Sequence, residues 1–141
     1  MTGALTANLA ASDELTSVKG GAGDDTITVS KLAANAVLEG GAGKDTLVLD
    51  TVTGTLQPTM SGFENVKVSG GNVTLSGKNV QDFTALEVTN GAAVTLANVD
   101  ASEFAVTASG TTAGSVTLSS PTKLTYNTTA SAAKTAAKTA D

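Results

Sequence analysis

The sequence predicts an all-β fold, a right-handed parallel β-roll that continues as a β-solenoid with coils of about 20 residues. Three observations support this prediction. The string GGAGDDTI at positions 20–27 recurs as GGAGKDTL at positions 40–47. The string Val-Thr-Leu begins at Val73 and recurs at nearly the same spacing from Val94 and from Val116. The chain is also rich in the small side chains of strands and turns, and only 3% of it is aromatic,.

Residues 15–29 and 35–49 are expected to form two stacked coils, because they match when the chain is overlaid on itself at a shift of 20. The overlay superposes apolar residues and opposite charges: Val18/Leu38, Ile27/Leu47, Val29/Leu49, Lys19/Glu39 and Asp24/Lys44. Equivalent residues in stacked coils lie about 4.8 Å apart, so like charges there would be destabilising. The exception is Asp25 over Asp45, and a cation is expected at that place.

The repeat changes its spacing after residue 50. Residues 51–61, which include Pro58, are predicted to form an irregular crossover between a glycine-rich roll (1–50) and a continuing solenoid (62–126). Within the solenoid, residues 66–68 and 86–88 alternate apolar and charged side chains, which indicates half-buried strands,. Residues 127–141 are rich in Ala, Lys and Thr and are predicted to be a low-complexity tail, either a short helix or a disordered end.

The composition argues against several classes of function. The net charge is −5, with eight lysines and no arginine, whereas nucleic-acid binding needs clustered cationic side chains. Histidine and cysteine are both absent, which removes the usual general base and the thiolate nucleophile. We find neither a Ser-His-Asp arrangement nor the aromatic residues that wall a glycosidase cleft. No apolar run approaches the roughly 18 residues of a membrane span. The chain is therefore not expected to be an enzyme or to span a membrane.

The two glycine loops form the candidate metal site. Glycine lets the backbone turn tightly and direct carbonyl oxygens inward, and calcium takes 6–8 oxygen ligands in a flexible geometry. The predicted ligands are two carboxylates and the loop carbonyls: Asp25, Asp45, Gly20, Gly21, Gly23, Gly40, Gly41 and Gly43. One calcium ion between the loops is expected, and half-sites on their outer faces remain open. In the alternative, the aspartates lie in a surface turn and only hydrogen-bond the backbone.

Other acidic residues near the loops are expected to have no metal. Asp24 is expected to face Lys44 at the surface, although direct ligation is the competing interpretation. Asp50 is expected at a solvated strand end and could instead assist a half-site. Asp13 and Glu14 are expected in a polar turn or helix cap, with cation binding from the preceding coil as the alternative.

The two loops fit the nonapeptide pattern GGxGxDxUx, and they resemble the RTX-repeat family of calcium-binding proteins exported by type I secretion. The strings GFENV at residues 62–66 and FTALEV at residues 83–88 lie among Thr-, Ala-, Val- and Gly-rich coils. These coils are similar to bacterial surface-layer (S-layer) proteins that carry RTX repeats. The motif match covers about a fifth of the chain, and the likeness to surface-layer proteins extends over residues 15–120. Residues 30–36, at the opposite edge of the coil, lack a glycine loop, so no calcium is expected there.

The resemblance implies a calcium-linked fold, export to the cell surface and self-assembly into a lattice. The chain would then be a calcium-stabilised structural module of a bacterial surface-layer protein located outside the cell. Its partners would be copies of itself, with cell-surface polysaccharide as a further candidate partner. Two alternatives remain open: a spacer or binding module of a type I-secreted RTX adhesin, and the noncatalytic RTX roll of a secreted enzyme.

Overall fold

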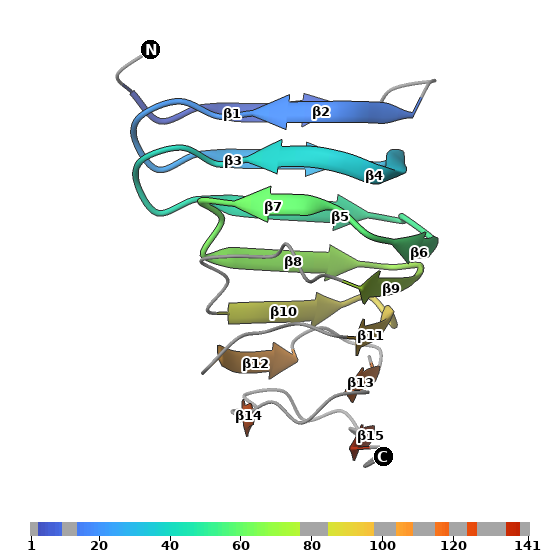
Figure 1. Cartoon of the computed structure of the whole chain (residues 1–141). Helices are drawn as coiled ribbons and strands as arrows, with labels where there is room; N and C mark the ends of the chain where they lie inside the picture. Colours follow the sequence, from blue (N-terminus) through green and yellow to red (C-terminus); the bar gives the residue numbers. More distant parts are fainter. Residues whose placement is uncertain are drawn as a thin grey trace.

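The chain folds as a β-solenoid in which parallel strands stack from β1 at one end to β14 and β15 at the other (Figure 1). We describe it from a computed structural model, which describes residues 3–9, 14–76, 85–97, 104–108, 115–118, 124–126 and 135–138. All regular secondary structure in these ranges is β. They contain no helix that is long and apolar enough to cross a membrane. The predicted all-β solenoid is confirmed.

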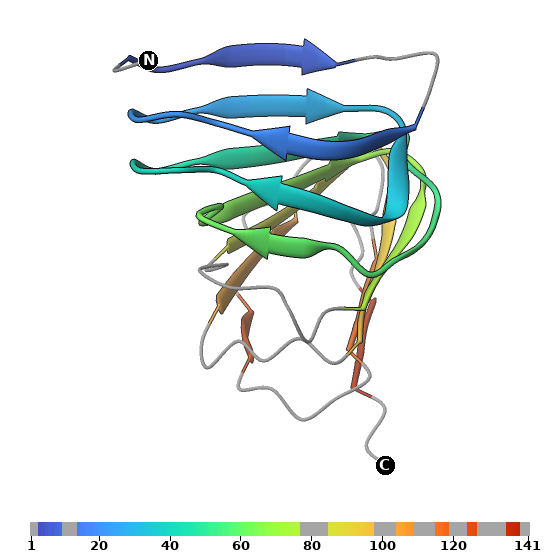
Figure 2. The same cartoon turned by 45° about the horizontal axis from the view of Figure 1, so that its top comes forward.

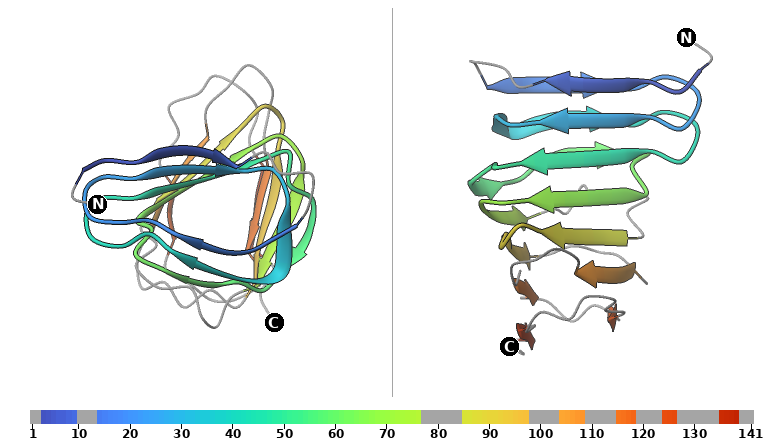
Figure 3. Two further views of the ribbon diagram at one scale, coloured as in Figure 1. Left: turned by 90° about the horizontal axis from the view of Figure 1, so that it is seen from above. Right: turned by 180° about the vertical axis from the view of Figure 1, so that it is seen from behind.

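Three parallel sheets form the walls of the coil (Figures 2 and 3). The long sheet contains β1 (Thr6–Leu9), β3 (Thr26–Val29), β5 (Thr46–Asp50), β8 (Asn65–Ser69), β10 (Ala85–Thr89), β12 (Phe104–Ala108) and β14 (Leu124–Tyr126). The upper sheet contains β2 (Leu15–Lys19), β4 (Leu32–Glu39) and β7 (Thr59–Ser61). The lower sheet contains β6 (Gly54–Leu56), β9 (Asn72–Ser76), β11 (Ala93–Ala97), β13 (Ser115–Leu118) and β15 (Thr135–Lys138).

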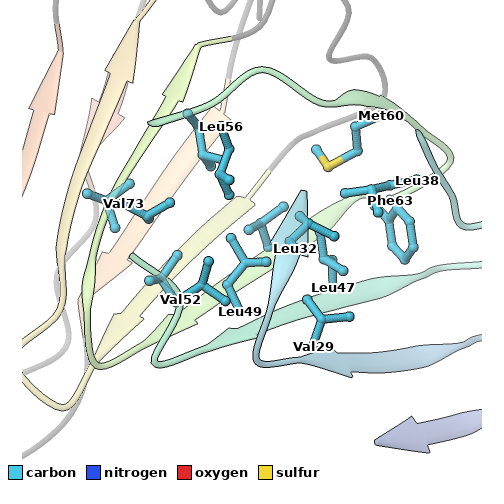
Figure 4. Close-up of a cluster of buried hydrophobic side chains, with 14 of the residues drawn as sticks. Val29, Leu32, Leu38, Leu47, Leu49, Val52, Leu56, Met60, Phe63 and Val73 are labelled. Carbon is cyan, nitrogen blue, oxygen red and sulfur yellow. The ribbon is translucent and has the colours of Figure 1, made fainter. Parts of the chain in front are cut away.

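The strand register places apolar side chains in columns that run along the core. Ile27 pairs with Leu47, Leu47 with Val66 and Val66 with Leu86, and each of these side chains is at most 1% exposed. The spacing along this column is nearly constant, so the predicted overlay holds within one residue. Side chains from all three sheets meet in this core (Figure 4). Burying each large apolar side chain contributes roughly 1.5–3 kcal/mol, so the columns hold successive coils together.

The other predicted pairings are confirmed in the same way. Val18 pairs with Leu38 in the upper sheet, and the three Val-Thr-Leu strings pair in register in the lower sheet. Outside the core, Lys19 and Glu39 form an ion pair of 2.8 Å, and Lys67 and Glu87 lie 3.7 Å apart. Stacking in a parallel sheet thus brings the predicted opposite charges together.

The segment predicted as an irregular crossover is part of the coil. Residues 51–61 contain β6 and β7, which pair with the lower and the upper sheet respectively. Leu56, Pro58 and Met60 are buried in alternation, which is the pattern of a strand. Pro58 lies between the two strands, where its missing N–H breaks no ladder bond. The coil of β5, β6 and β7 therefore ends the upper sheet and begins the lower one.

The predicted low-complexity tail also differs from the structure. Within residues 127–141, the segment Thr135–Lys138 forms β15 and pairs in parallel with β13, where Thr135 lies opposite Ser115. A helix or a disordered end was expected because the composition is Ala/Lys/Thr-rich. Backbone pairing needs no particular side chain, and the free edge of β13 offers unpaired N–H and C=O groups, so small residues can extend the sheet.

Candidate metal centre

The two glycine loops lie one above the other at the corner between the upper and the long sheet. Residues 20–25 join β2 to β3, and residues 40–45 join β4 to β5. The loops are tied by Gly23 N–H, which donates to the Ala42 carbonyl (2.7 Å), and by Ala42 N–H, which donates to the Gly21 carbonyl (3.0 Å). Gly23 and Gly43 have φ of 109° and 132°, a region that favours glycine. The loops therefore stack as the sequence predicted.

Glycine is required at the first position of each loop because the loops approach each other closely. A Cβ added at Gly20 would overlap the Gly40 carbonyl and lie 2.6 Å from Asp25 Oδ2. A Cβ added at Gly40 would overlap the Gly62 carbonyl and lie 2.7 Å from Asp45 Oδ2. In each loop a carbonyl oxygen and a carboxylate oxygen thus face the same space, which a side chain would fill.

Asp25 and Asp45 are both fully buried, at 0% exposure, at adjacent levels of the stack. Asp25 Oδ1 accepts the Leu5 N–H (2.8 Å) and its Oδ2 accepts the Gly21 N–H (2.7 Å). Asp45 Oδ1 accepts the Asp25 N–H (2.7 Å). Each aspartate thus hydrogen-bonds the backbone of the coil above it, as the alternative interpretation had it. The burial, however, is not that of the surface turn in that alternative.

A third carboxylate continues this arrangement and was missed by the sequence analysis. Glu64 Oε2 accepts the Asp45 N–H at 2.7 Å, so we call Asp25, Asp45 and Glu64 the carboxylate ladder. Each member directly precedes a strand of the long sheet. The loop of Glu64 is only three residues, 62–64, whereas the glycine loops have six. The additional methylene of glutamate lets the carboxylate reach the coil above from this shorter loop.

Asp45 Oδ2 is the one buried side-chain oxygen or nitrogen without a hydrogen-bond partner in the described part of the chain. Burial raises the pKa of Asp45 above its ordinary value of 3.8. The hydrogen bond with the backbone of Asp25 lowers the pKa, and the negative charges of Asp25, Glu64 and Asp24 raise it. An ionised carboxylate here is costly because it is desolvated and faces like charges.

The remaining acidic residues lie away from the ladder. Asp24 is exposed and its Oδ1 accepts the backbone N–H of Lys44 (2.8 Å), so its contact with Lys44 is made through the backbone. Asp50 is half-buried at the end of β5, where it pairs with Ser69. Glu14 is exposed, and Asp13 lies outside the described residues. None of these positions is tied to the stacked glycine loops except Asp24.

The donor set of this corner suits a hard cation. It consists of carboxylate and carbonyl oxygens, which calcium prefers. Among the described residues, no three Asp, Glu, His or Cys side chains converge on one point, so backbone carbonyls and water would complete the coordination. A surface depression lined by Lys19, Glu39, Gly41 and Gly62, among others, lies beside the loops. The residues thus fit calcium in chemistry.

Comparison of the chain with protein-family models, with curated proteins and with solved structures finds no match. The inference of function therefore rests on the fold and on the geometry of this corner.

Proposed function

We propose that the chain is a calcium-stabilised structural module that assembles with copies of itself at a bacterial cell surface. The observation that carries the proposal is the buried pair Asp25 and Asp45, in which Asp45 Oδ2 has no partner. Two carboxylates buried at adjacent levels of a stack destabilise it when both are ionised. A divalent cation would offset this cost, and that gives the arrangement a purpose.

Calcium would be held by the carboxylates of Asp25 and Asp45 and by carbonyls of the loops 20–25 and 40–45. When bound, it supplies positive charge that replaces lost hydration and relieves the repulsion between the carboxylates. Because the loops stack only in the folded chain, binding would be linked to folding. Extracellular calcium modules typically have dissociation constants of about 10⁻⁴–10⁻³ M, so such a module would be stabilised outside the cell.

The outer face of the lower sheet supports self-assembly. Its described residues are uncharged and small, and they are repeated in register from strand to strand: Thr55, Asn72, Thr74, Ala93 and Thr95. Charged side chains oppose face-to-face packing because they must be desolvated. A regular neutral face suits contact with a second copy of the chain.

Electron microscopy of the purified chain, with calcium and with a chelator, tests the assembly. We expect ordered, concentration-dependent arrays with calcium and none with the chelator. Monomers under both conditions would contradict self-assembly and would favour a spacer module instead.

Circular dichroism tests the calcium site separately. The double variant Asp25→Ala/Asp45→Ala should lose the calcium-dependent gain of β signal. An unchanged gain in the double variant would contradict the site.

A further inference from the structure

The two aspartates of the glycine loops occupy the same motif position but differ in one contact. Asp25 Oδ2 accepts the Gly21 N–H at 2.7 Å, whereas Asp45 Oδ2 has no partner. The difference originates in the second glycine of each loop. Gly41 has φ of 114°, and Gly21 is not among the residues with positive φ. The Gly41 nitrogen lies 2.9 Å from the Cβ position of Gly62, so it is close to the loop below.

The open oxygen of Asp45 faces a gap whose other wall is also an oxygen. The Cβ position of Gly40 is 2.7 Å from Asp45 Oδ2 and is overlapped by the Gly62 carbonyl. Gly40 itself is buried. A buried gap lined by an unpartnered carboxylate oxygen and a carbonyl oxygen attracts a cation, because two like partial charges otherwise face each other there.

Glu64 brings a second full negative charge to the same level. Its Oε2 accepts the Asp45 N–H at 2.7 Å, which holds its carboxylate directly beneath Asp45. The negative charge of Glu64 also contributes to the raised pKa of Asp45. Carboxylate oxygens have about four lone-pair sites, so this hydrogen bond leaves the carboxylate able to bind a metal.

We propose that a second calcium ion binds beneath Asp45, between the loops 40–45 and 62–64, with Asp45 Oδ2, Glu64 and the Gly62 carbonyl as ligands. This inference rests on the proposed calcium binding and adds a site that the repeated glycine motif does not contain. Water completes the coordination, and the depression beside Gly41 and Gly62 gives access from solvent. Asp45 then lies between two ions, one on each side.

The variant Glu64→Gln separates a ligand from a hydrogen-bond acceptor. Glutamine keeps a side-chain oxygen that can accept the Asp45 N–H but carries no charge. If Glu64 served only the backbone, the variant would bind calcium as the wild type does. Asp50→Asn is the matched control, because it removes one negative charge at the end of β5, outside the carboxylate ladder.

Isothermal titration with calcium chloride measures the sites in the wild type and both variants. We expect two ions for the wild type and Asp50→Asn, and one for Glu64→Gln, or a loss of affinity at one site of about tenfold or more. Identical titrations of Glu64→Gln and the wild type would overturn the second site alone. No binding by the wild type would overturn the proposed function as well.

Backbone amide NMR of the wild type gives a readout that does not depend on a variant folding. Added calcium should shift the amide signals of Gly62 and Glu64 as well as those of loop 20–25. Shifts confined to loops 20–25 and 40–45, with Gly62 and Glu64 unmoved, would overturn the second site.

Discussion

Two corners of this solenoid turn the chain between sheets by different physical means. The carboxylate corner (20–25, 40–45 and 62–64) stacks buried acids, and each acid accepts a backbone N–H from the coil above. The neutral corner (69–72 and 89–92) uses Gly70, Gly71, Asn90 and Gly91, all with φ between 55° and 76°. Its levels are joined by Gly70 N–H to the Thr89 carbonyl (3.1 Å) and by neutral side chains. The same stacking can thus be independent of ionisation or dependent on it.

The largest expected difference between the corners comes from adding one methyl group to a glycine. Gly40→Ala should cost at least about 3 kcal/mol or prevent folding, because the new Cβ would overlap the Gly62 carbonyl,. Gly70→Ala should cost only about 1–2 kcal/mol, the penalty of a left-handed conformation, because its Cβ would meet Thr51 Cγ2 at an ordinary 3.5 Å. Urea unfolding measures both. Equal losses would contradict the close stacking of the carboxylate corner.

Removing the charge of Asp45 should stabilise the chain in the absence of calcium. Asp45→Asn keeps an oxygen for the Asp25 N–H and removes a buried, unpartnered charge. We expect a gain of about 1–2 kcal/mol at pH 7 with a chelator present. Asp50→Asn, at the half-buried end of β5, should change stability little. Urea unfolding in chelator compares the two, and a large loss in Asp45→Asn would show that its charge is favourable without metal.

The raised pKa of Asp45 predicts how stability without calcium varies with pH. A carboxyl whose pKa is higher in the folded chain binds a proton more tightly when folded. Its contribution to stability is therefore fully present below the ordinary value of 3.8 and is lost as the pH rises through the raised folded value,. Thermal unfolding between pH 3 and pH 7 should show this loss in the wild type, and a smaller loss in Asp45→Asn. Parallel curves for the two proteins would contradict the assignment.

The smallest effect is expected from the ion pair on the outer face of the long sheet. Lys67 and Glu87 are 3.7 Å apart and their side chains are 39% and 41% exposed, so solvent screens their attraction. Lys67→Gln should cost less than about 1 kcal/mol and should leave the response to calcium unchanged. A change in calcium response would indicate coupling between the outer face and the carboxylate corner, which the described contacts do not include.

The sequence predicted the parts of the fold that depend on periodic side chains. Apolar residues at a constant spacing led to the core columns of Ile27 and Leu47, and the glycine motif led to the buried pair Asp25 and Asp45. The division into an upper and a lower sheet was not predictable, because a strand pattern says which face is buried but does not name the partner strand. Pro58 suggested irregular backbone and so concealed β6 and β7.

The sequence could not predict two features of the site. Glu64 lies in a loop three residues shorter than the glycine loops, so its spacing from Asp45 broke the match on which the overlay relied. Asp25 and Asp45 occupy identical motif positions, yet only Asp45 has an open oxygen. That difference comes from the close approach of Gly41 and Gly62, which is tertiary.

The most direct test of the account is thermal unfolding of the wild type and Asp45→Asn at pH 7, each with calcium and with a chelator. With dissociation constants of about 10⁻⁴–10⁻³ M, calcium at about 10 mM should stabilise the wild type by about 1.4–2.7 kcal/mol per ion. Asp45→Asn should gain much less from calcium. Equal stability of the wild type with calcium and with chelator would contradict the claim that calcium stabilises this solenoid through its buried carboxylates.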